Sequence, residues 1–298
     1  MPEHFADRLL EAIRQKGSPV CVGLDPVYDR LPDALKGEDD DVVEQLDQIE
    51  AFCLQLLELV APFVPAIKPQ SAYFEVFGSE GVSVYEACVE RAHSLGMVVI
   101  GDVKRNDIGS TAQAYAAGHL RPDDEFCVDA VTVNGYLGSD GIKPFIDQAT
   151  PAGKGLFVLV RTSNPSAREL QDLTADGKKI YEHMAALVAS LGSASVGACG
   201  YSNVGAVVGA TYPDEARALR QIMPQQIFLV PGYGAQGGTA ADAAASFKPD
   251  GTGAIVNASR SVIFAHKEKK YAGMDWKLAI QAAAKDFAAD IAGAVRVK

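Results

Sequence analysis

The sequence has little of what marks exported, disulfide-bonded or nucleic-acid-binding proteins. Its five cysteines are odd in number and scattered over 298 residues, which favours free thiols in a reducing compartment over a disulfide framework or a paired metal site. Basic residues are outnumbered, with 27 Lys and Arg against 38 Asp and Glu. The resulting net charge of −11 argues against broad binding to nucleic acid or to an anionic membrane. A local cluster of cations would still bind a small anion.

Long apolar runs are also missing. No stretch approaches the roughly 18 apolar residues needed to cross a bilayer. The first sixteen positions carry several charges, whereas a signal peptide needs an uninterrupted apolar core. The spacing of the apolar residues there instead predicts an amphipathic helix, formed by Phe5, Leu9, Leu10 and Ile13. We therefore expect a soluble, cytoplasmic protein.

Motifs for metal and dinucleotide binding are absent as well. The five histidines fall mostly on predicted helices, and no H-x-x-x-H or H-E-x-x-H pattern occurs. The pattern G-x-G-x-x-G matches residues 232–237 only formally, because this stretch lies late in the chain without an acidic residue at the expected spacing. The sequence therefore predicts neither a metal site nor a dinucleotide site.

What the chain does contain is an alternation of short apolar strands with helical segments. The predicted strands are 19–24, 66–69, 97–104, 130–134, 156–160, 204–209, 227–230 and 253–256. Helical periodicity predicts helices at 43–60, 84–95, 111–120, 142–148, 176–191, 213–223 and 276–292. Parallel strands need such crossovers, and this many units favour a (β/α)8 barrel over an open sheet. Because no linker or composition break divides the chain, we predict an α/β fold with one TIM-barrel domain over residues 1–298.

Charged residues occupy an unusual place on the third predicted strand. Alternation puts Asp102 and Lys104 on the same face as Ile100. Asp107 follows where the chain turns toward a helix. Three charges thus converge where burial is expected, and burying charges is costly unless they neutralise one another or serve a purpose. A structural ion pair and a catalytic group both remain open at this point.

Polar residues follow most of the other strands, at the rim where barrel enzymes gather their catalytic groups. They are Asp25, Lys68, Asn134, Ser163, Gln236 and Arg260. Lys68 lies on the strand expected beside that of Asp102, so it would extend the charges into a network of alternating sign. The usual alternative for such a residue is a surface lysine whose stem covers apolar surface.

The loop after the seventh predicted strand is rich in glycine. Residues 231–238 contain four glycines, which let backbone N–H groups approach an anion closely. Loops after the seventh and eighth strands of such barrels are frequent phosphate sites. Arg260, just past the eighth strand, offers a fork of donors that matches a phosphate. The combination predicts phosphate binding, whereas the glycines alone would fit a plain tight turn.

Together these motifs resemble those of the orotidine 5′-phosphate decarboxylase family. Residues 102–111, D-V-K-R-N-D-I-G-S-T, are similar to its D-x-K-x-x-D-I motif. Matching residues occur in the same order elsewhere in the chain, at Asp25, Lys68, Ser163, 231–236 and Arg260. The D-x-K-x-x-D element is shared with related phosphosugar decarboxylases and aldolases, but Ile108, Thr111 and the glycine-rich loop favour orotidylate.

The resemblance runs from about residue 18 to residue 265 and is greatest with the longer bacterial branch of the family. It implies decarboxylation of orotidine 5′-monophosphate to uridine 5′-monophosphate and CO2 in de novo pyrimidine biosynthesis, without metal or organic cofactor. The extra segments 28–50 and 165–203 align poorly with compact members, so no role is assigned to them.

The resemblance also implies roles for individual residues. Lys104 would stabilise and then protonate the carbanion at C6, with Asp102 beside the substrate carboxylate, and Lys68 and Asp107 would complete the catalytic network. The implied substrate-binding residues are Asp25, Ile108, Thr111, Ser163, Pro231, Gly234, Gln236, Ser259 and Arg260.

Among these, Asp25 would face the ribose together with Lys68, and Ser163 would meet the pyrimidine edge. Phosphate would be held by Gln236, Arg260 and the backbone around Gly234 and Ser259. In this family the second aspartate of the motif reaches the partner's site, so the resemblance implies a homodimer in which Asp107, Ile108 and Thr111 cross over.

Two other functions stay open on the sequence. A related phosphosugar lyase would work through a metal-bound enediolate and would lose activity with a chelator. A non-catalytic barrel that binds a phosphate ligand would bind nucleotide without turnover.

Overall fold

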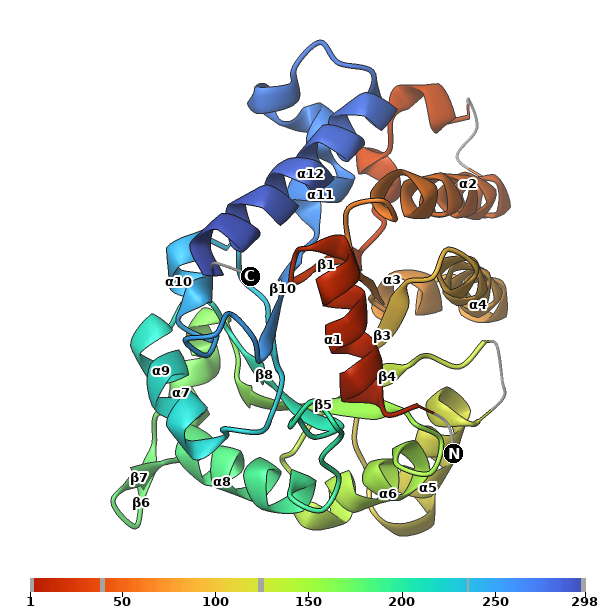
Figure 1. Cartoon of the computed structure of the whole chain (residues 1–298). Coiled ribbons are helices and arrows are strands. Elements are labelled where there is room, and N and C mark those ends of the chain that lie inside the picture. The colour runs from red at the N-terminus through yellow and green to blue at the C-terminus, as the bar shows by residue number, and fades with distance from the viewer. Residues whose placement is uncertain (1–2, 38–40, 123–125, 235, 296–298) are drawn as a thin grey trace.

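The computed structural model shows a closed barrel of parallel strands surrounded by helices (Figure 1). It describes residues 3–37, 41–122, 126–234 and 236–295. In chain order the barrel strands are β1 (Val20–Leu24), β2 (Ala66–Pro69), β3 (Val98–Arg105), β4 (Ala130–Val133), β5 (Gly155–Arg161), β8 (Val204–Val208), β9 (Phe228–Val230) and β10 (Ala254–Ala258). Around the barrel they run β1-β10-β9-β8-β5-β4-β3-β2. The predicted (β/α)8 fold is confirmed.

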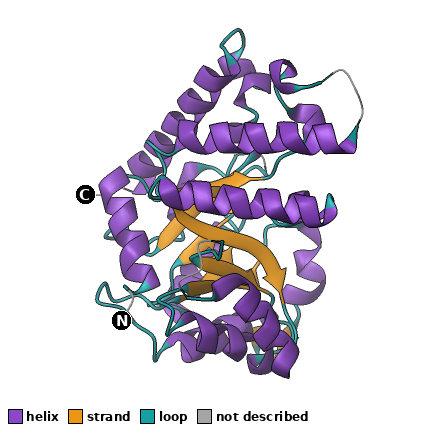
Figure 2. Cartoon of the chain, turned by 90° about the vertical axis from the view of Figure 1, so that its right-hand side faces the viewer, coloured by secondary structure: helices purple, strands orange, loops and turns teal. Residues whose placement is uncertain are grey.

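Helices follow the strands and cover the outside of the barrel (Figure 2). The longer ones are α1 (Phe5–Lys16), α2 (Val42–Val60), α4 (Gly78–Ser94), α5 (Gly109–Leu120), α6 (Ser139–Ala149), α8 (Ile180–Gly192), α9 (Pro213–Ile222) and α12 (Trp276–Val295). Shorter ones are α3 (Ala72–Glu75), α7 (Arg168–Gln171), α10 (Ala240–Ala244) and α11 (Arg260–Ile263).

The inside of the barrel is filled by side chains from all its strands and is covered at one end by α1. Figure 1 shows α1 lying across this end of the barrel. Phe5 of α1 packs edge-to-face on Phe157 of β5, with ring centroids 5.9 Å apart. The ring of Phe5 also requires a glycine at position 155, because a Cβ at that position would lie 2.3 Å from it. With the amino ends of the strands covered, a ligand enters from the carboxyl ends.

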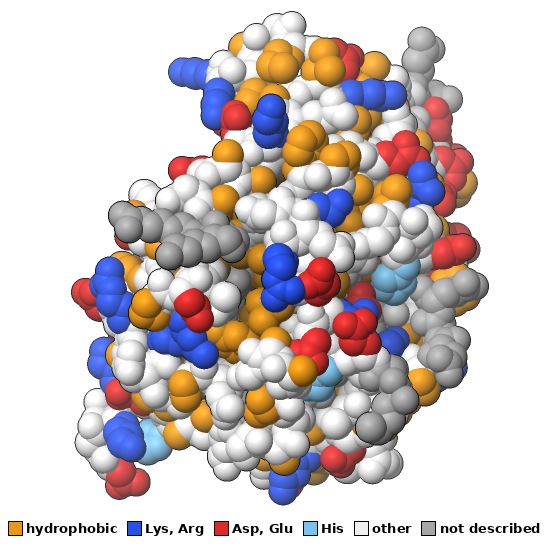
Figure 3. All heavy atoms as spheres, viewed as in Figure 1, with side chains coloured by type: hydrophobic (Ala, Val, Ile, Leu, Met, Phe, Trp, Pro, Cys, Tyr) orange, Lys and Arg blue, Asp and Glu red, His pale blue; other side chains and the backbone are white. Residues whose placement is uncertain are grey.

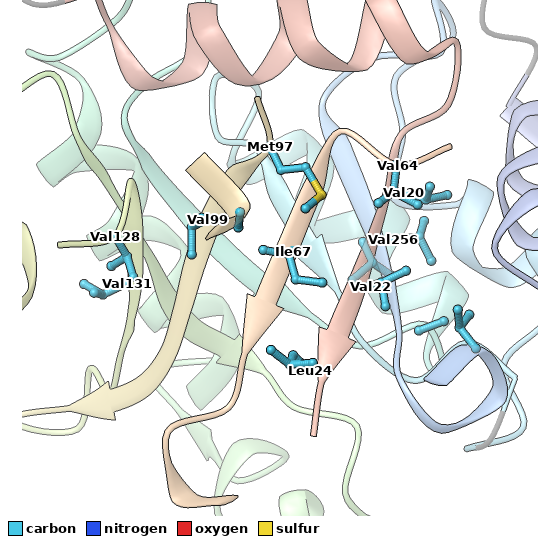
Figure 4. Close-up of a cluster of buried hydrophobic side chains, with 14 of the residues drawn as sticks. Val20, Val22, Leu24, Val64, Ile67, Met97, Val99, Val128, Val131 and Val256 are labelled. Carbon is cyan, nitrogen blue, oxygen red and sulfur yellow. The ribbon is translucent and has the colours of Figure 1, made fainter. Parts of the chain in front are cut away.

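A second core lies between the strands and the surrounding helices. Figure 4 shows Val20, Val22 and Leu24 of β1 beside Ile67 of β2 and Val99 of β3. All five are buried. Each strand therefore buries both of its faces, and this is why the strands are continuous apolar runs in the sequence.

The predicted helix 176–191 is wrong at its start. Residues 174–179 form a two-stranded hairpin, β6 (Thr174–Ala175) and β7 (Lys178–Lys179), and the helix begins only at Ile180. Asp176 and Gly177 both have positive φ, 48° and 75°. An Asp-Gly pair adopts this left-handed conformation readily and favours a two-residue hairpin turn over a helical start.

Other differences concern the extent of elements. The helix expected at 84–95 begins at Gly78, and the one expected at 142–148 begins at Ser139. The first turn of α4 is exposed at Ser79 and Glu80. This turn therefore lacks the apolar periodicity from which a helix is predicted.

Surface and thiol features agree with a folded globular chain. All five cysteines are free, and four of them are buried, as expected. On the face seen in Figure 3, Lys and Arg side chains are interspersed with Asp and Glu. Within the described ranges, no helix combines the length and apolarity that a membrane crossing demands.

Candidate active site

A cavity of about 430 Å³ opens at the carboxyl ends of the barrel strands. Its lining includes most of the residues predicted for the site. They are Asp25, Lys68, Asp102, Lys104, Ser163, Pro231, Gln236, Ser259 and Arg260. Segments more than 200 positions apart in the sequence thus meet in one hollow, as the barrel closure predicts.

Asp102 is the centre of the charged network. Its Oδ2 accepts a hydrogen bond from Lys68 Nζ at 2.5 Å, and its Oδ1 accepts one from Lys104 Nζ at 2.5 Å. Gln70 Nε2 donates to Oδ2 at 3.0 Å, and Thr132 Oγ1 donates to Oδ1 at 3.0 Å. Side chains on β2, β3 and β4, together with Gln70 just after β2, therefore hold this buried carboxylate in one orientation.

These contacts fix the charges of the network. Burial disfavours the ionised form of Asp102, but Lys68 and Lys104 outweigh it and hold the pKa of the carboxyl well below its usual range. Lys68 is 5% exposed. Burial acts to lower its pKa, but Asp102 and Asp25 outweigh that effect and raise it. Both groups are therefore charged at neutral pH, while the Lys104 side chain, 45% exposed, keeps part of its ammonium open to the cavity.

The backbone at Lys104 is not that of a regular strand. Its φ is 45°, in the left-handed region that a side chain disfavours, and the pairing of β3 with β4 shifts between Gly101 and Arg105. Thr132 Oγ1 accepts a hydrogen bond from Lys104 N at 2.9 Å. The same hydroxyl that binds Asp102 therefore also holds the strained peptide of the lysine.

Ile100, Asp102 and Lys104 do face inward as predicted. Ile100 is buried in the core inside the barrel, and the two charged side chains line the cavity above it. The predicted alternation is confirmed, although the bulge gives Lys104 a backbone conformation that alternation does not predict.

The glycine-rich loop forms another part of the cavity wall. Gly232, Gly234 and Gly237 all have positive φ, between 70° and 101°. Gly237 N donates to Gly234 O at 2.8 Å, closing a tight turn. Gln236 and the exposed Arg260, which begins α11, line the same cavity, whereas Gly234 does not. Ala235 lies outside the described residues.

Two buried acceptors in the cavity have no partner in the described part of the chain. They are Asp25 Oδ1 and Asn257 Oδ1. Both lie near the first strand, where Gly23 is required because a Cβ would come within 1.9 Å of Ser259 Oγ. A ligand with hydroxyl groups would supply the missing donors.

Asp107, Ile108 and Thr111 do not line the cavity of their own chain. Asp107 Oδ1 instead accepts a hydrogen bond from Ile108 N at 2.8 Å. Ile108 is 56% exposed, and Thr111 is exposed in the first turn of α5. Among the described residues of one chain, the ion pairs of the network join Lys68, Asp102 and Lys104 and do not include Asp107.

Sequence reasoning missed Gln70, Thr132 and Asn257, all of which line the cavity. A signal for Thr132 was present, because alternation from Ala130 places this polar residue on the inner face of an otherwise apolar strand. Asn257 interrupts the apolar run of β10 in the same way. Gln70 carries no such signal, since it follows a strand end like many loop residues.

The fold and the site define a (β/α)8-barrel enzyme with a buried Lys-Asp-Lys centre beside a glycine-rich loop and an arginine. Residues 18–273 match the orotidine 5′-phosphate decarboxylase / HUMPS family. The chain belongs to this family and, like its relatives, is a carboxy-lyase.

Its relatives match along nearly their full lengths. The orotidine 5′-phosphate decarboxylase of Rhodopirellula baltica is 45% identical over 292 residues, covering 94% of this chain and 96% of that protein. A crystal structure from Streptomyces avermitilis has a TM-score of 0.83 at 37% identity, covering 99% of this chain and 97% of that one. The structure of Leishmania donovani OMP decarboxylase has a TM-score of 0.77 at 31% identity, with 99% and 100% covered.

Proposed function

We propose that this carboxy-lyase converts orotidine 5′-monophosphate to uridine 5′-monophosphate and CO2, with Lys104 as the group that stabilises and protonates the carbanion. The reaction, a step of pyrimidine biosynthesis, follows from the family and its named relatives. The roles of individual residues rest on one observation above all. Lys104 is fixed by a buried, ionised Asp102 and still presents its ammonium to the cavity.

The chemistry requires such a fixed cation. When the bond from C6 to the carboxylate breaks, its electron pair stays on C6, where no π-system delocalises it. An ammonium aimed at that carbon stabilises the developing charge, most strongly in a site from which water is excluded. Lys104 Nζ then gives a proton to C6 and becomes neutral. Asp102 holds Lys104 Nζ in position until that transfer.

The remaining lining residues suit a mononucleotide. The volume of about 430 Å³ lies in the range of small-ligand sites. We assign Asp25 and Lys68 to the ribose hydroxyls, because Asp25 Oδ1 is a buried acceptor without a partner in the described residues. We assign Ser163 to the pyrimidine edge.

The phosphate is assigned to the wall formed by the glycine-rich loop. Gln236 and Arg260 would hold it together with Pro231 and Ser259, which line the cavity with them. The backbone around Gly234, which belongs to the same loop, would add N–H donors. The phosphate is remote from the bond that breaks, so its binding energy can orient the substrate at the reacting carbon.

We also propose a homodimer in which Asp107, Ile108 and Thr111 enter the partner's site. These residues lie outside the cavity of their own chain. Ile108 is itself 56% exposed, and Tyr136, just before α6, is 73% exposed. The helices that follow them, α5 and α6, pack against each other, so these side chains belong to one region of the surface.

The first prediction tests the role of Lys104. Replacing Lys104 with alanine should lower kcat by at least about 1,000-fold, because both the electrostatic stabilisation and the proton donor are lost. The measurement is the fall in pyrimidine absorbance with orotidine 5′-monophosphate, with circular dichroism to confirm a folded barrel. Lys285→Ala, at an exposed lysine on α12 outside the proposed dimer surface, is the matched control and should keep wild-type turnover.

Substantial turnover by Lys104→Ala would rule out its role as proton donor. The same assay separates the other functions. Loss of wild-type activity with a chelator, together with turnover of a sugar phosphate, would favour a metal-dependent phosphosugar lyase. Nucleotide binding without any turnover would favour a non-catalytic barrel.

A further inference from the structure

The loop that carries Ser163 is held by a residue from the extra segment 165–203. Gln171, the last residue of α7, accepts a hydrogen bond from Thr162 N through Oε1 at 3.0 Å. Its Nε2 donates to Thr162 Oγ1 at 2.7 Å, and that hydroxyl donates to Asn164 Oδ1 at 2.7 Å. Thr162, Ser163 and Asn164 all line the cavity. One side chain thus fixes both the peptide and the hydroxyl next to Ser163.

The short helix α7 is itself tied to the barrel by a buried cation. Arg161, at the end of β5, is fully buried. Its Nη1 lies 3.4 Å from Gln171 Oε1 and 3.0 Å from Asp172 Oδ1. Its guanidinium lies 3.9 Å from the centre of the Tyr212 ring. Because Arg161 is the last residue of β5, these contacts tie α7 to the end of that strand.

Ser163 is also confined from the opposite side. Gly209, just after β8, donates its N–H to Arg161 O at 2.8 Å. A Cβ at Gly209 would lie only 3.0 Å from Ser163 Cβ, so the two segments are in close contact. The loop therefore lies between the end of β8 and the side chain of Gln171.

We propose that Gln171 is a positioning residue that sets the place of Ser163 against the pyrimidine edge. It acts through Thr162 and is not among the residues that line the cavity. The inference rests on the proposed function, because it requires Ser163 to meet the base. It gives the extra segment of this chain a task in recognising the base rather than the phosphate.

The test compares a ligand that has the base with one that lacks it. In Gln171→Met the side chain keeps its length but loses both hydrogen-bonding functions. Uridine 5′-monophosphate should bind about tenfold more weakly, as expected for the loss of two neutral hydrogen bonds that order the loop. The Kd of ribose 5-phosphate should change by less than about twofold. Titration calorimetry with the full chain measures both.

Two further variants complete the series. Gln171→Glu keeps the oxygen that accepts from Thr162 N and should recover most of the lost affinity. Glu169→Ala, at an exposed residue of the same helix, should bind both ligands as the wild type does. Thermal unfolding of each variant shows that the barrel is intact.

The outcomes separate this inference from the function on which it rests. Equal weakening of both ligands by Gln171→Met, or no change in either, would overturn the positioning role. Ser163→Ala serves as the reference. If it weakens uridine 5′-monophosphate selectively while Gln171→Met does not, the proposed function stands and the inference alone fails. If Ser163→Ala shows no selectivity, both the base contact and the inference fall.

Discussion

At the scale of single residues, the site depends on one hydroxyl that serves two partners. Thr132 Oγ1 accepts from Lys104 N and donates to Asp102 Oδ1. Lys104 has φ of 45°, a conformation that costs a non-glycine residue about 1–3 kcal/mol unless its surroundings impose it. Thr132 therefore stabilises the strained backbone of the lysine and orients the carboxylate that holds its ammonium.

Replacing Thr132 with valine should leave the backbone N–H of Lys104 without its acceptor and remove one of the four donors to Asp102. We expect kcat for orotidine 5′-monophosphate to fall about 10- to 100-fold, corresponding to about 1–3 kcal/mol for buried groups without hydrogen bonds. KM should change less, because the cavity keeps its shape. Steady-state kinetics measures the split.

The conservative variant Thr132→Ser restores the hydroxyl and should recover most of kcat. If Thr132→Ser fails to restore kcat while Thr132→Val unfolds at the wild-type temperature, the hydroxyl is not what positions Lys104. An effect on KM alone would also contradict the assignment.

At the scale of elements, the amino end of β4 joins three other elements through one carboxylate. Asp129 Oδ1 accepts from Arg8 Nη1 of α1 at 2.7 Å, and its Oδ2 lies 3.1 Å from His93 Nε2 of α4. Val99 N of β3 donates to Oδ2 at 2.8 Å. Burial would raise the pKa of Asp129, but its contacts with His93, Arg8 and Val99 N outweigh it and lower the pKa to about 2.

A carboxyl group whose pKa is lower in the folded state than in the unfolded state stabilises the fold at any pH above its unfolded-state pKa. That stabilisation is lost as the pH falls through the folded-state pKa. For Asp129 the window runs from about 4 down to about 2. Asp129→Asn should therefore lower the free energy of unfolding by about 2 kcal/mol at pH 7. The difference should shrink as the pH approaches 2.

Urea unfolding of wild type and Asp129→Asn at several pH values measures this difference. Turnover per folded molecule should be unchanged, since Asp129 lies at the amino end of β4, away from the cavity. A difference that stays constant from pH 7 to pH 2 would show that the charge of Asp129 does not stabilise the fold.

At the scale of the whole molecule, the proposed dimer makes two inactive variants complementary. Asp107→Ala and Lys104→Ala should each be inactive alone. In a mixed dimer, one site combines Lys104 of one chain with Asp107 of the other, and both are intact there. Random assortment after mixing and refolding should therefore restore about a quarter of wild-type activity.

Size-exclusion chromatography of the mixture checks that dimers have formed. An active Asp107→Ala homodimer would remove Asp107 from the catalytic network. Dimers that form but show no recovered activity would mean that each site draws both residues from the same chain.

The sequence alone was sufficient for the barrel and for most of its rim. Strands buried on both faces are continuous apolar runs, and parallel pairing forces a helix between them, so periodicity carries this information locally. Periodicity gave a wrong helix start at Asp176 and Gly177. These two residues adopt a left-handed conformation, which favours a hairpin turn there in place of the first turn of a helix. The charged motif was also local, because Asp102 and Lys104 are two positions apart.

Only the tertiary structure decided which side chains serve those residues. Lys68, 34 positions from Asp102, and Thr132, 30 positions from it, meet the carboxylate because adjacent barrel strands bring their ends together. Gln171 holds Thr162 because α7 is tied to a buried arginine, in a segment to which the sequence assigned no role. Hydrogen bonds between distant segments depend on positions in space to within a fraction of an ångström, and no periodicity along the chain encodes them.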